Sequence, residues 1–249
     1  MVRDCVSGGY RYLPGITAFS SGVIATPGFE IVHATLASPV PWREGFTRII
    51  DNHLRAEGRP RAALCGIELR SPAPFTFDGF AAFNEGYRDL LADWKLLIGD
   101  DNPLPRTNVA PVTAGPREPS LYAFDYTVAG TTPAPTFVVA GAGEMRDRTQ
   151  GARGIVRHGE TSPEAMREKA RFVMGIMQER MKALGAEWSR ATTIDVYCAE
   201  SIHGFLVDEI LGPAGAAAIH GVRWFPSRPP VQGLEFEVDV RGVRRELTI

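Results

Sequence analysis

Two arginines, each followed by a carboxylate on a later strand, are the residues best suited to chemistry in this chain. Arg106 is followed by Asp125, and Arg223 by Glu237, at separations that would let an antiparallel return of the chain set each pair side by side. A guanidinium can hold a substrate carboxylate through two parallel hydrogen bonds, and a neighbouring carboxylate can polarise a water molecule. From spacing alone, a plain salt bridge between adjacent strands is the commoner arrangement, so both interpretations stay open.

Motifs of several other catalytic classes are missing from the sequence. It contains no G-x-S-x-G elbow, no Walker loop and no H-E-x-x-H, and its five histidines never fall at metal-ligand spacing. The run Gly141-Ala142-Gly143-Glu144 lacks the spacing of a dinucleotide-binding loop. The three cysteines are far apart without a C-x-x-C pair, which argues against a disulfide framework or a zinc site. We therefore expect no metal and no cofactor.

Composition places the chain among ordinary globular proteins. Lys and Arg number 27 against 29 Asp and Glu, a net charge of −2, so we expect no electrostatic grip on nucleic acid or on an anionic membrane. No stretch approaches the roughly 18 apolar residues of a spanning helix, and residues 1–12 lack the apolar region of a signal peptide. These features predict a cytoplasmic location.

The elements that would position the two arginines occur twice along the chain. The first half shows a helix over 42–57 that ends at Gly58, an apolar strand over 62–69, an aromatic-rich helix over 80–91 and a strand from Arg106. The second half shows a helix that ends at Gly185, a strand over 192–199, a short helix over 205–211 and a strand from Arg223. Such a repeat predicts two copies of one α/β unit.

The segment 130–135 is the best candidate for a linker between the two units, because it combines Gly, Thr and Pro. We therefore expect an α+β protein with one module over 1–130 and another over 136–249. A chain of 249 residues suits two modules of about 120 residues each.

Local signals sharpen two of these elements. Ser162 is expected to cap a helix that has Pro163 at its first position and a methionine-rich face that packs in the core. Asp78 is expected to cap the aromatic-rich helix. Near the C-terminus, residues 234–240 alternate apolar side chains with acidic ones, including Glu237, so this strand has one dry face and an acidic face that meets solvent or lines a cleft.

Several of these features together resemble the Rid family, the reactive-intermediate imine/enamine deaminases. They are the Ser20-Ser21-Gly22 strand, the helix with Phe80, Phe83, Asn84 and Tyr87, the Pro105-Arg106-Thr107 step, and the closing Phe236-Glu237-Val238-Asp239. The resemblance is strongest to two-module members similar to 2-aminomuconate and 2-amino-5-chloromuconate deaminases, which degrade aromatic compounds. It implies two tandem chorismate-mutase-like modules, each a mixed β-sheet packed on two helices, and ligand clefts between modules.

The resemblance also implies roles for particular residues. The family's arginine grips a substrate carboxylate and its glutamate orients the hydrolytic water, which carries over to Arg223 with Glu237. Arg106 is a further catalytic candidate, although Asp125 matches the family's glutamate only if a bulge shifts its register. Composite sites are also open, with one module giving the arginine and the other giving substrate-binding residues. The substrate-binding candidates are Ser21, Tyr122, Asp125, His220 and Glu144.

We therefore expect a metal-free hydrolytic deaminase, which converts a 2-aminomuconate-type enamine or imine carboxylate to the keto or enol acid and ammonia. The alternative is a module of the same fold that binds a small carboxylate or a protein without chemistry. A tautomerase-like enzyme would want an N-terminal proline, which Val2 cannot replace. Exposed sheet edges favour a homo-oligomer, and the family favours a trimer.

Overall fold

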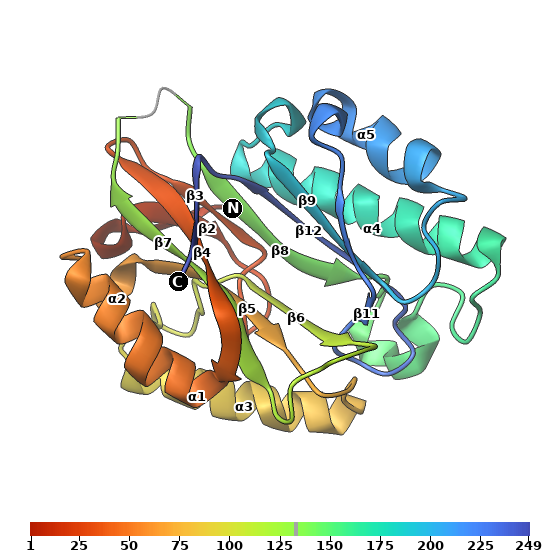
Figure 1. The fold of residues 1–249 in the computed structure, drawn as a ribbon, viewed down its shortest axis with the longest axis horizontal. Helices are drawn as coiled ribbons and strands as arrows, with labels where there is room; N and C mark the ends of the chain where they lie inside the picture. The colour runs from red at the N-terminus through yellow and green to blue at the C-terminus, as the bar shows by residue number, and fades with distance from the viewer. Residues whose placement is uncertain (132–133) are drawn as a thin grey trace.

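Two β-sheets lie face to face, and helices cover the outer face of each sheet (Figure 1). The computed structural model describes residues 1–131 and 134–249, so the predicted linker at 130–135 lies partly outside the described residues. The combination of mixed sheets and a few helices agrees with the predicted α+β class. Among the described residues, no helix is long and apolar enough to cross a bilayer.

One sheet has six strands in the order β11-β6-β5-β7-β4-β13. Their bounds are β4 Phe29–Pro41, β5 Leu64–Arg70, β6 Arg106–Pro111, β7 Ser120–Ala129, β11 Ser227–Arg228 and β13 Arg245–Thr248. The other sheet has seven strands in the order β1-β2-β3-β8-β12-β9-β10. Their bounds are β1 Arg3–Cys5, β2 Tyr10–Leu13, β3 Gly22–Ala25, β8 Phe137–Gly143, β9 Thr193–Cys198, β10 Arg223–Phe225 and β12 Phe236–Gly242.

Four strands follow the same order and directions in both sheets. In β6-β5-β7-β4 and in β10-β9-β12-β8, the first two strands are parallel and the other neighbours are antiparallel. The ends of the chain then cross over. Strands β1 to β3 extend the sheet that the second half builds, and β13 pairs with β4 of the first half. The module ranges 1–130 and 136–249 stay a prediction.

The helices lie between the strands as the sequence predicts, with small shifts at their ends. The first half has α1 Trp42–Glu44, a π-helical turn Gly45–Ile50, α2 Asp51–Ala56 and α3 Phe77–Asp93; the second has α4 Pro163–Leu184, a π-helical turn Leu206–Leu211 and α5 Gly212–Ala214. Short 3₁₀ turns cover Val6–Gly8, Arg61–Ala63, Arg148–Gly154, Trp188–Arg190 and Gly215–His220.

The ends of the two long helices test the predicted caps. Ser162 caps α4 as expected, since its hydroxyl accepts the Ala165 N–H, and Gly185 ends the helix with φ of 75°. The cap expected from Asp78 is wrong. Thr76 caps α3 instead by accepting the Gly79 N–H at 3.0 Å, because the helix begins one residue before Asp78 and leaves that aspartate inside the first turn.

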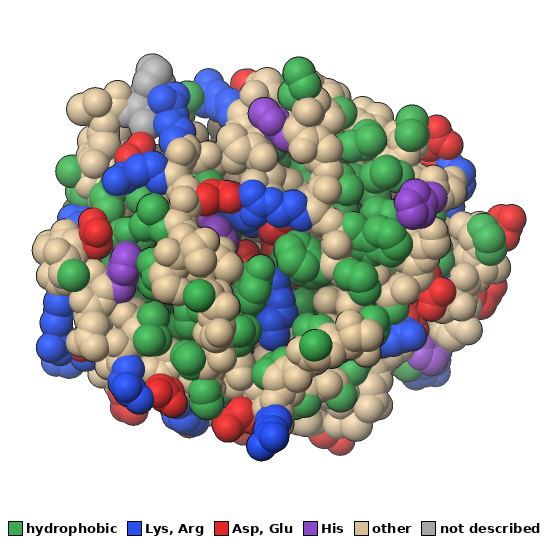
Figure 2. All heavy atoms as spheres, in the orientation of Figure 1, with side chains coloured by type: hydrophobic (Ala, Val, Ile, Leu, Met, Phe, Trp, Pro, Cys, Tyr) green, Lys and Arg blue, Asp and Glu red, His purple; other side chains and the backbone are tan. Residues whose placement is uncertain are grey.

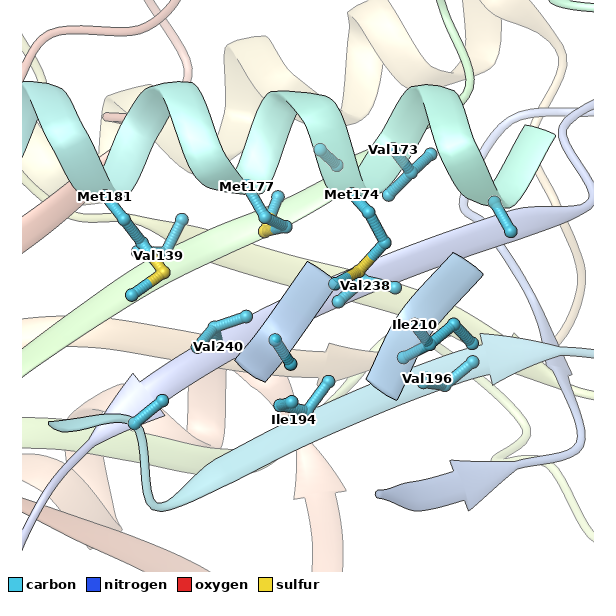
Figure 3. Packing of buried hydrophobic residues seen from close by; sticks show 14 of the residues in the cluster. Val139, Val173, Met174, Met177, Met181, Ile194, Val196, Ile210, Val238 and Val240 are labelled. Atoms are coloured by element: carbon cyan, nitrogen blue, oxygen red, sulfur yellow. The ribbon is translucent and has the colours of Figure 1, made fainter. Parts of the chain in front are cut away.

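The methionine-rich face of α4 is core, as predicted. Met174, Met177 and Met181 point from α4 onto valines of the sheet beneath (Figure 3), and all three are at most 2% exposed. Val139, Val238 and Val240 of β8 and β12 form the facing layer. This apolar layer fixes the direction of every other side chain on β12, because residues alternate across a strand.

The opposite face of β12 is charged and points at the other sheet. Glu237, Asp239 and Arg241 are each at most 4% exposed, so the acidic face lies between the sheets and does not meet bulk solvent. Arg241 Nη1 lies 2.5 Å from Asp195 Oδ2 and 3.7 Å from Glu68 Oε1 of the facing sheet. A carboxylate cluster of Glu68, Asp195 and Asp239 has metal-ligand spacing, but the Arg241 guanidinium lies among those oxygens and supplies the positive charge.

The C-terminal strand β13 is tied across the two sheets by one carboxylate. Glu246 accepts hydrogen bonds from Arg223 Nη2 at 2.6 Å and from Arg241 Nε at 3.0 Å. These bonds, with the Coulombic attraction of the two arginines, outweigh the effect of burial and hold the pKa of Glu246 at about 2.

On the face drawn in Figure 2, positive and negative side chains are interspersed, with no large area of a single sign.

Replacing Glu246 by glutamine should destabilise the protein in a pH-dependent way. The folded-state pKa is depressed from 4.5, so the ionised form contributes stability above that pH and loses it as pH falls toward 2. Because 32% of the side chain is exposed, we expect a loss of only about 1 kcal/mol at pH 7, measured by urea denaturation. Glu44→Gln, which breaks an exposed pair with Arg48, should cost at most about 0.5 kcal/mol. Equal losses in both variants would contradict a stabilising role for the hydrogen bonds of Glu246 with Arg223 and Arg241.

Candidate active site

A cavity of about 300 Å³ lies at the seam where β6 of one sheet meets β8 of the other. The seam is held by the Gly141 N–H, which donates to Thr107 Oγ1 at 3.0 Å, while the Thr107 hydroxyl donates to Asp239 at 2.8 Å. Both halves of the chain line the cavity. Its walls are Phe19, Phe77, Phe80, Arg106, Asn108, Gly141, Ala142, Gly143, Met145, Arg148, Ile176, Arg180, Pro230, Val231, Leu234 and Glu237.

Arg106 is buried in an aromatic setting that leaves much of its guanidinium unpaired. Its Nη2 donates to Asn84 Oδ1 at 2.6 Å, and its Cζ lies 4.6 Å from the ring centre of Tyr87 and 4.9 Å from that of Phe19. Nε and Nη1 have no hydrogen-bond partner among the described residues. Burial lowers the pKa of Arg106 to about 10. Buried donors without partners are costly, so this side chain is prepared to bind an anion.

Glu237 is the acid of the cavity. It is 4% exposed, and burial raises its pKa to about 8, with the positive charge of Arg180 pulling in the opposite direction. Its carboxyl group lies over Gly141, where a Cβ atom would collide with Oε1, so the glycine makes room for it. A carboxyl group with a pKa near neutrality can both donate and accept a proton at physiological pH.

Arg148 and Arg180, which the sequence analysis did not predict as site residues, also line the cavity. Arg180 comes from α4, and its Nη1 donates to Ala140 O at 2.8 Å; burial lowers its pKa to about 10. Arg148 comes from the 3₁₀ turn after β8 and lies over Phe19 at 5.7 Å. Arg180 follows Ile176 by one helical turn at the margin of the apolar face of α4, which is the one signal that could have identified it.

The structure does not bring Arg223 beside Glu237. Strand β9 lies between β10 and β12, with β10 parallel to it and β12 antiparallel, so the partner of Glu237 on β9 is Tyr197. Arg223 pairs with Glu246, and half of its side chain is exposed. The expected facing pair in the second half is therefore wrong as a contact, because the strand that follows the helix is inserted between the arginine and the acid.

The same insertion separates the other expected pair. Strand β5 lies between β6, which carries Arg106, and β7, which carries Asp125. Asp125 accepts a 2.8 Å hydrogen bond from Nδ1 of His33, which lies opposite it on the neighbouring strand β4 of the same sheet. The cavity instead combines Arg106 of the first half with Glu237 of the second, one arginine and one acid of the two predicted pairs.

The remaining candidates do not line this cavity. The Ser21 hydroxyl donates to Pro14 O, and Tyr122 stacks under Arg70, whose Cζ lies 3.8 Å from the ring centre. His220 is exposed beside a separate hollow near Thr136. Glu144 is fully buried, pairs with Lys169 at 3.1 Å and accepts the backbone N–H groups of Glu235 and Phe236. Their predicted roles in substrate binding stay predictions.

The arrangement suits an anionic substrate with an electrophilic carbon. Guanidinium groups in a cavity of low dielectric attract carboxylates strongly, and they withdraw electron density from an adjacent carbon. Apolar side chains, including Phe80 and Leu234, form part of the walls, and the Glu237 carboxyl group can exchange protons with a water molecule.

The comparisons with known proteins point to one family. The model of the family described as 2-aminomuconate deaminase CnbZ matches residues 2–247. The chain is 43% identical over 245 residues to the 2-amino-5-chloromuconate deaminase of Comamonas testosteroni, with 97% of this chain and 96% of that protein covered.

Similar solved structures are more distant. A chorismatase has 14% identity and a TM-score of 0.46, covering 89% of this chain and 77% of its own. A cyanuric acid hydrolase has 11% identity and a TM-score of 0.39, covering 88% and 69%. Likeness at this level carries no conclusion, whereas the match along nearly the whole sequence does: this chain belongs to the 2-aminomuconate deaminase CnbZ family.

Proposed function

We propose that this protein is a hydrolytic deaminase that converts a 2-aminomuconate-type enamine or imine to the keto or enol acid and ammonia, without a metal ion. The observation that carries the proposal is the cavity in which Glu237, with a pKa of about 8, lies with the partly unpaired guanidinium of Arg106. The names of the matching family and of the Comamonas testosteroni relative support the substrate class.

The proposed reaction has three steps. An enamine first gains a proton on carbon and loses one from nitrogen, which gives the imine, and water then adds to the C=N carbon as its proton passes to nitrogen. In the tetrahedral carbinolamine, the hydroxyl group loses its proton and nitrogen gains one as the C–N bond breaks, so ammonia leaves and a C=O bond remains. Arg106 would pair with the carboxylate next to the reacting carbon, which fixes its position and makes it more electrophilic.

Glu237 would transfer the protons during the addition of water and during the release of ammonia. In its ionised form it accepts a proton from the attacking water, and in its protonated form it donates to the departing nitrogen. A carboxyl group with an ordinary pKa of 4.5 would be a poor donor at neutral pH, so the burial that raises its pKa is part of the proposed mechanism.

We also propose that the two halves are copies of a Rid-like module. The common order and directions of β6-β5-β7-β4 and β10-β9-β12-β8 support this relationship. The proposed site is composite, since it takes Arg106 from one half and Glu237 from the other. A homo-oligomer, with a trimer favoured, stays a prediction that light scattering would test.

Glu237→Gln should abolish most of the activity while the fold persists. We expect kcat to fall by about 10² to 10⁴, because the amide cannot exchange protons with water or nitrogen. Ammonia release and ultraviolet absorbance with 2-aminomuconate measure the effect. Glu235→Gln changes a nearby acid that pairs with Arg228, and it should retain activity. Tight binding of the substrate without turnover by the unmodified protein would favour the non-catalytic alternative.

Arg106→Lys should weaken substrate binding while the fold persists. A lysine keeps the charge but loses the fork, so we expect kcat/KM to fall by about 10-fold to 100-fold. Arg59→Lys is the matched control, because Arg59 also stacks on an aromatic ring, that of Phe29, but lies away from the cavity. Unchanged kinetics in Arg106→Lys would remove Arg106 from the proposed mechanism.

Glu237 should reduce the stability of the folded protein at high pH. The pKa of Glu237 rises from 4.5 to about 8 on folding, so the folded state binds the proton more tightly and stability falls as pH rises through that interval. Glu237→Gln should therefore be more stable than the unmodified protein at pH 8. The gain should grow with pH by at most about 1.4 kcal/mol per unit. Thermal unfolding at pH 5 and pH 8 measures this, and a gain independent of pH would contradict the raised pKa.

A further inference from the structure

We propose that Arg148 and Arg180 form a second carboxylate subsite, so that the cavity selects dicarboxylates over monocarboxylates. The proposal rests on the proposed function, because it concerns the second acid group of the same substrate. Arg106 serves the carboxylate beside the reacting carbon, and the two further arginines line the same cavity from α4 and from the turn after β8.

The charges that line the cavity do not balance. Among the described lining residues, Arg106, Arg148 and Arg180 carry positive charge, and Glu237 alone can carry a negative one. The excess is two positive charges when Glu237 is ionised and three when it is protonated. A substrate with one carboxylate would leave guanidinium groups unpaired in a partly desolvated space, which is unfavourable. A dianion neutralises the excess that an ionised Glu237 leaves.

Both arginines keep donors free for a ligand. Arg148 makes no hydrogen bond or ion pair with any described residue, and its nearest aromatic contact is Phe19. Arg180 uses Nη1 on the carbonyl oxygens of Ala140 and Gly141, at 2.8 and 3.4 Å, which leaves Nε and Nη2 without a described partner. Those two bonds also fix the direction of the Arg180 side chain.

The two guanidinium groups repel one another while the cavity holds no anion. Burial is the main cause that lowers the pKa of each, and the positive charge of Arg148 lowers the pKa of Arg180 further. A bound carboxylate would relieve both effects. Arg146, two residues before Arg148, is an arginine that already has a partner. It forms an exposed ion pair with Glu168 at 3.0 Å and does not line the cavity.

Unreactive ligands test the subsite independently of turnover. The full chain is titrated by calorimetry with cis,cis-muconate, which has two carboxylates, and with its monomethyl ester, which has one. We expect the diacid to bind at least about 10-fold tighter than the monoester, since a charge-assisted hydrogen bond pair is lost in the ester. Arg148→Met should remove about 10-fold of the affinity for the diacid and leave the monoester within about 2-fold.

Two other variants sharpen the result. Arg180→Lys keeps a positive charge and should fold, yet it should reduce the preference for the diacid because the fork is lost. Arg146→Met should change neither affinity. If Arg148→Met and Arg180→Lys keep the full preference, or weaken both ligands equally, the subsite is wrong.

The outcome separates this inference from the deaminase proposal. If the protein releases no ammonia from 2-aminomuconate but the variants lose their preference for the diacid, the deaminase proposal fails and the subsite stands. If turnover of 2-aminomuconate proceeds and neither variant affects the preference, the subsite fails and the deaminase proposal stands.

Discussion

The charged contact between the two sheets is the interaction on which the rest of the structure depends. Helices cover the outer face of each sheet, and the inner faces meet through two clusters. An apolar cluster that includes Val23, Ile31 and Cys65 packs at one part of this interface, and a charged cluster has Arg241 as its central cation. Buried ion pairs of this kind contribute little net stability compared with apolar packing, but loss of one partner costs about 3 to 5 kcal/mol. The interface therefore tolerates few changes and holds the sheets in one relative position.

That fixed position creates the cavity. Strand β6 and strand β8 belong to different sheets, and Thr107 of β6 joins them through its hydrogen bonds with Gly141 of β8 and Asp239 of β12. Beside this link the backbone of β8 is glycine-rich, which leaves room for the Glu237 carboxyl group. The same low-dielectric interior that makes the charged interface demanding raises the pKa of Glu237. The buried charged interface and the raised pKa of Glu237 thus share one physical origin, the low dielectric between the sheets.

Much of the fold could be read from the sequence, but the pairing of strands could not. Capping by Ser162, the end at Gly185 and the methionine face of α4 depend on local periodicity, and the structure confirms them. The partner of a strand is a property of the whole sheet. A parallel neighbour enters between each arginine and the later acid, and no local pattern around Arg106 or Arg223 reports this. The sequence could not identify Arg148 as a cavity residue for a similar reason, since it lies in a polar turn whose position depends on tertiary structure.

The two arginines that look equivalent in the sequence have different surroundings because the chain ends differ. Arg106 opens onto a seam that β13 does not reach, so its donors stay available. Arg223 occupies the corresponding strand of the other sheet, but β13 crosses over from the second half and brings Glu246 to it. An internal carboxylate thereby accepts a hydrogen bond from Arg223, whose side chain is half exposed, whereas the buried Arg106 has two nitrogens without a described partner. Two arginines at similar places in the sequence thus differ in burial and in partners, because the terminal strand brings a carboxylate to Arg223 and none to Arg106 among the described residues.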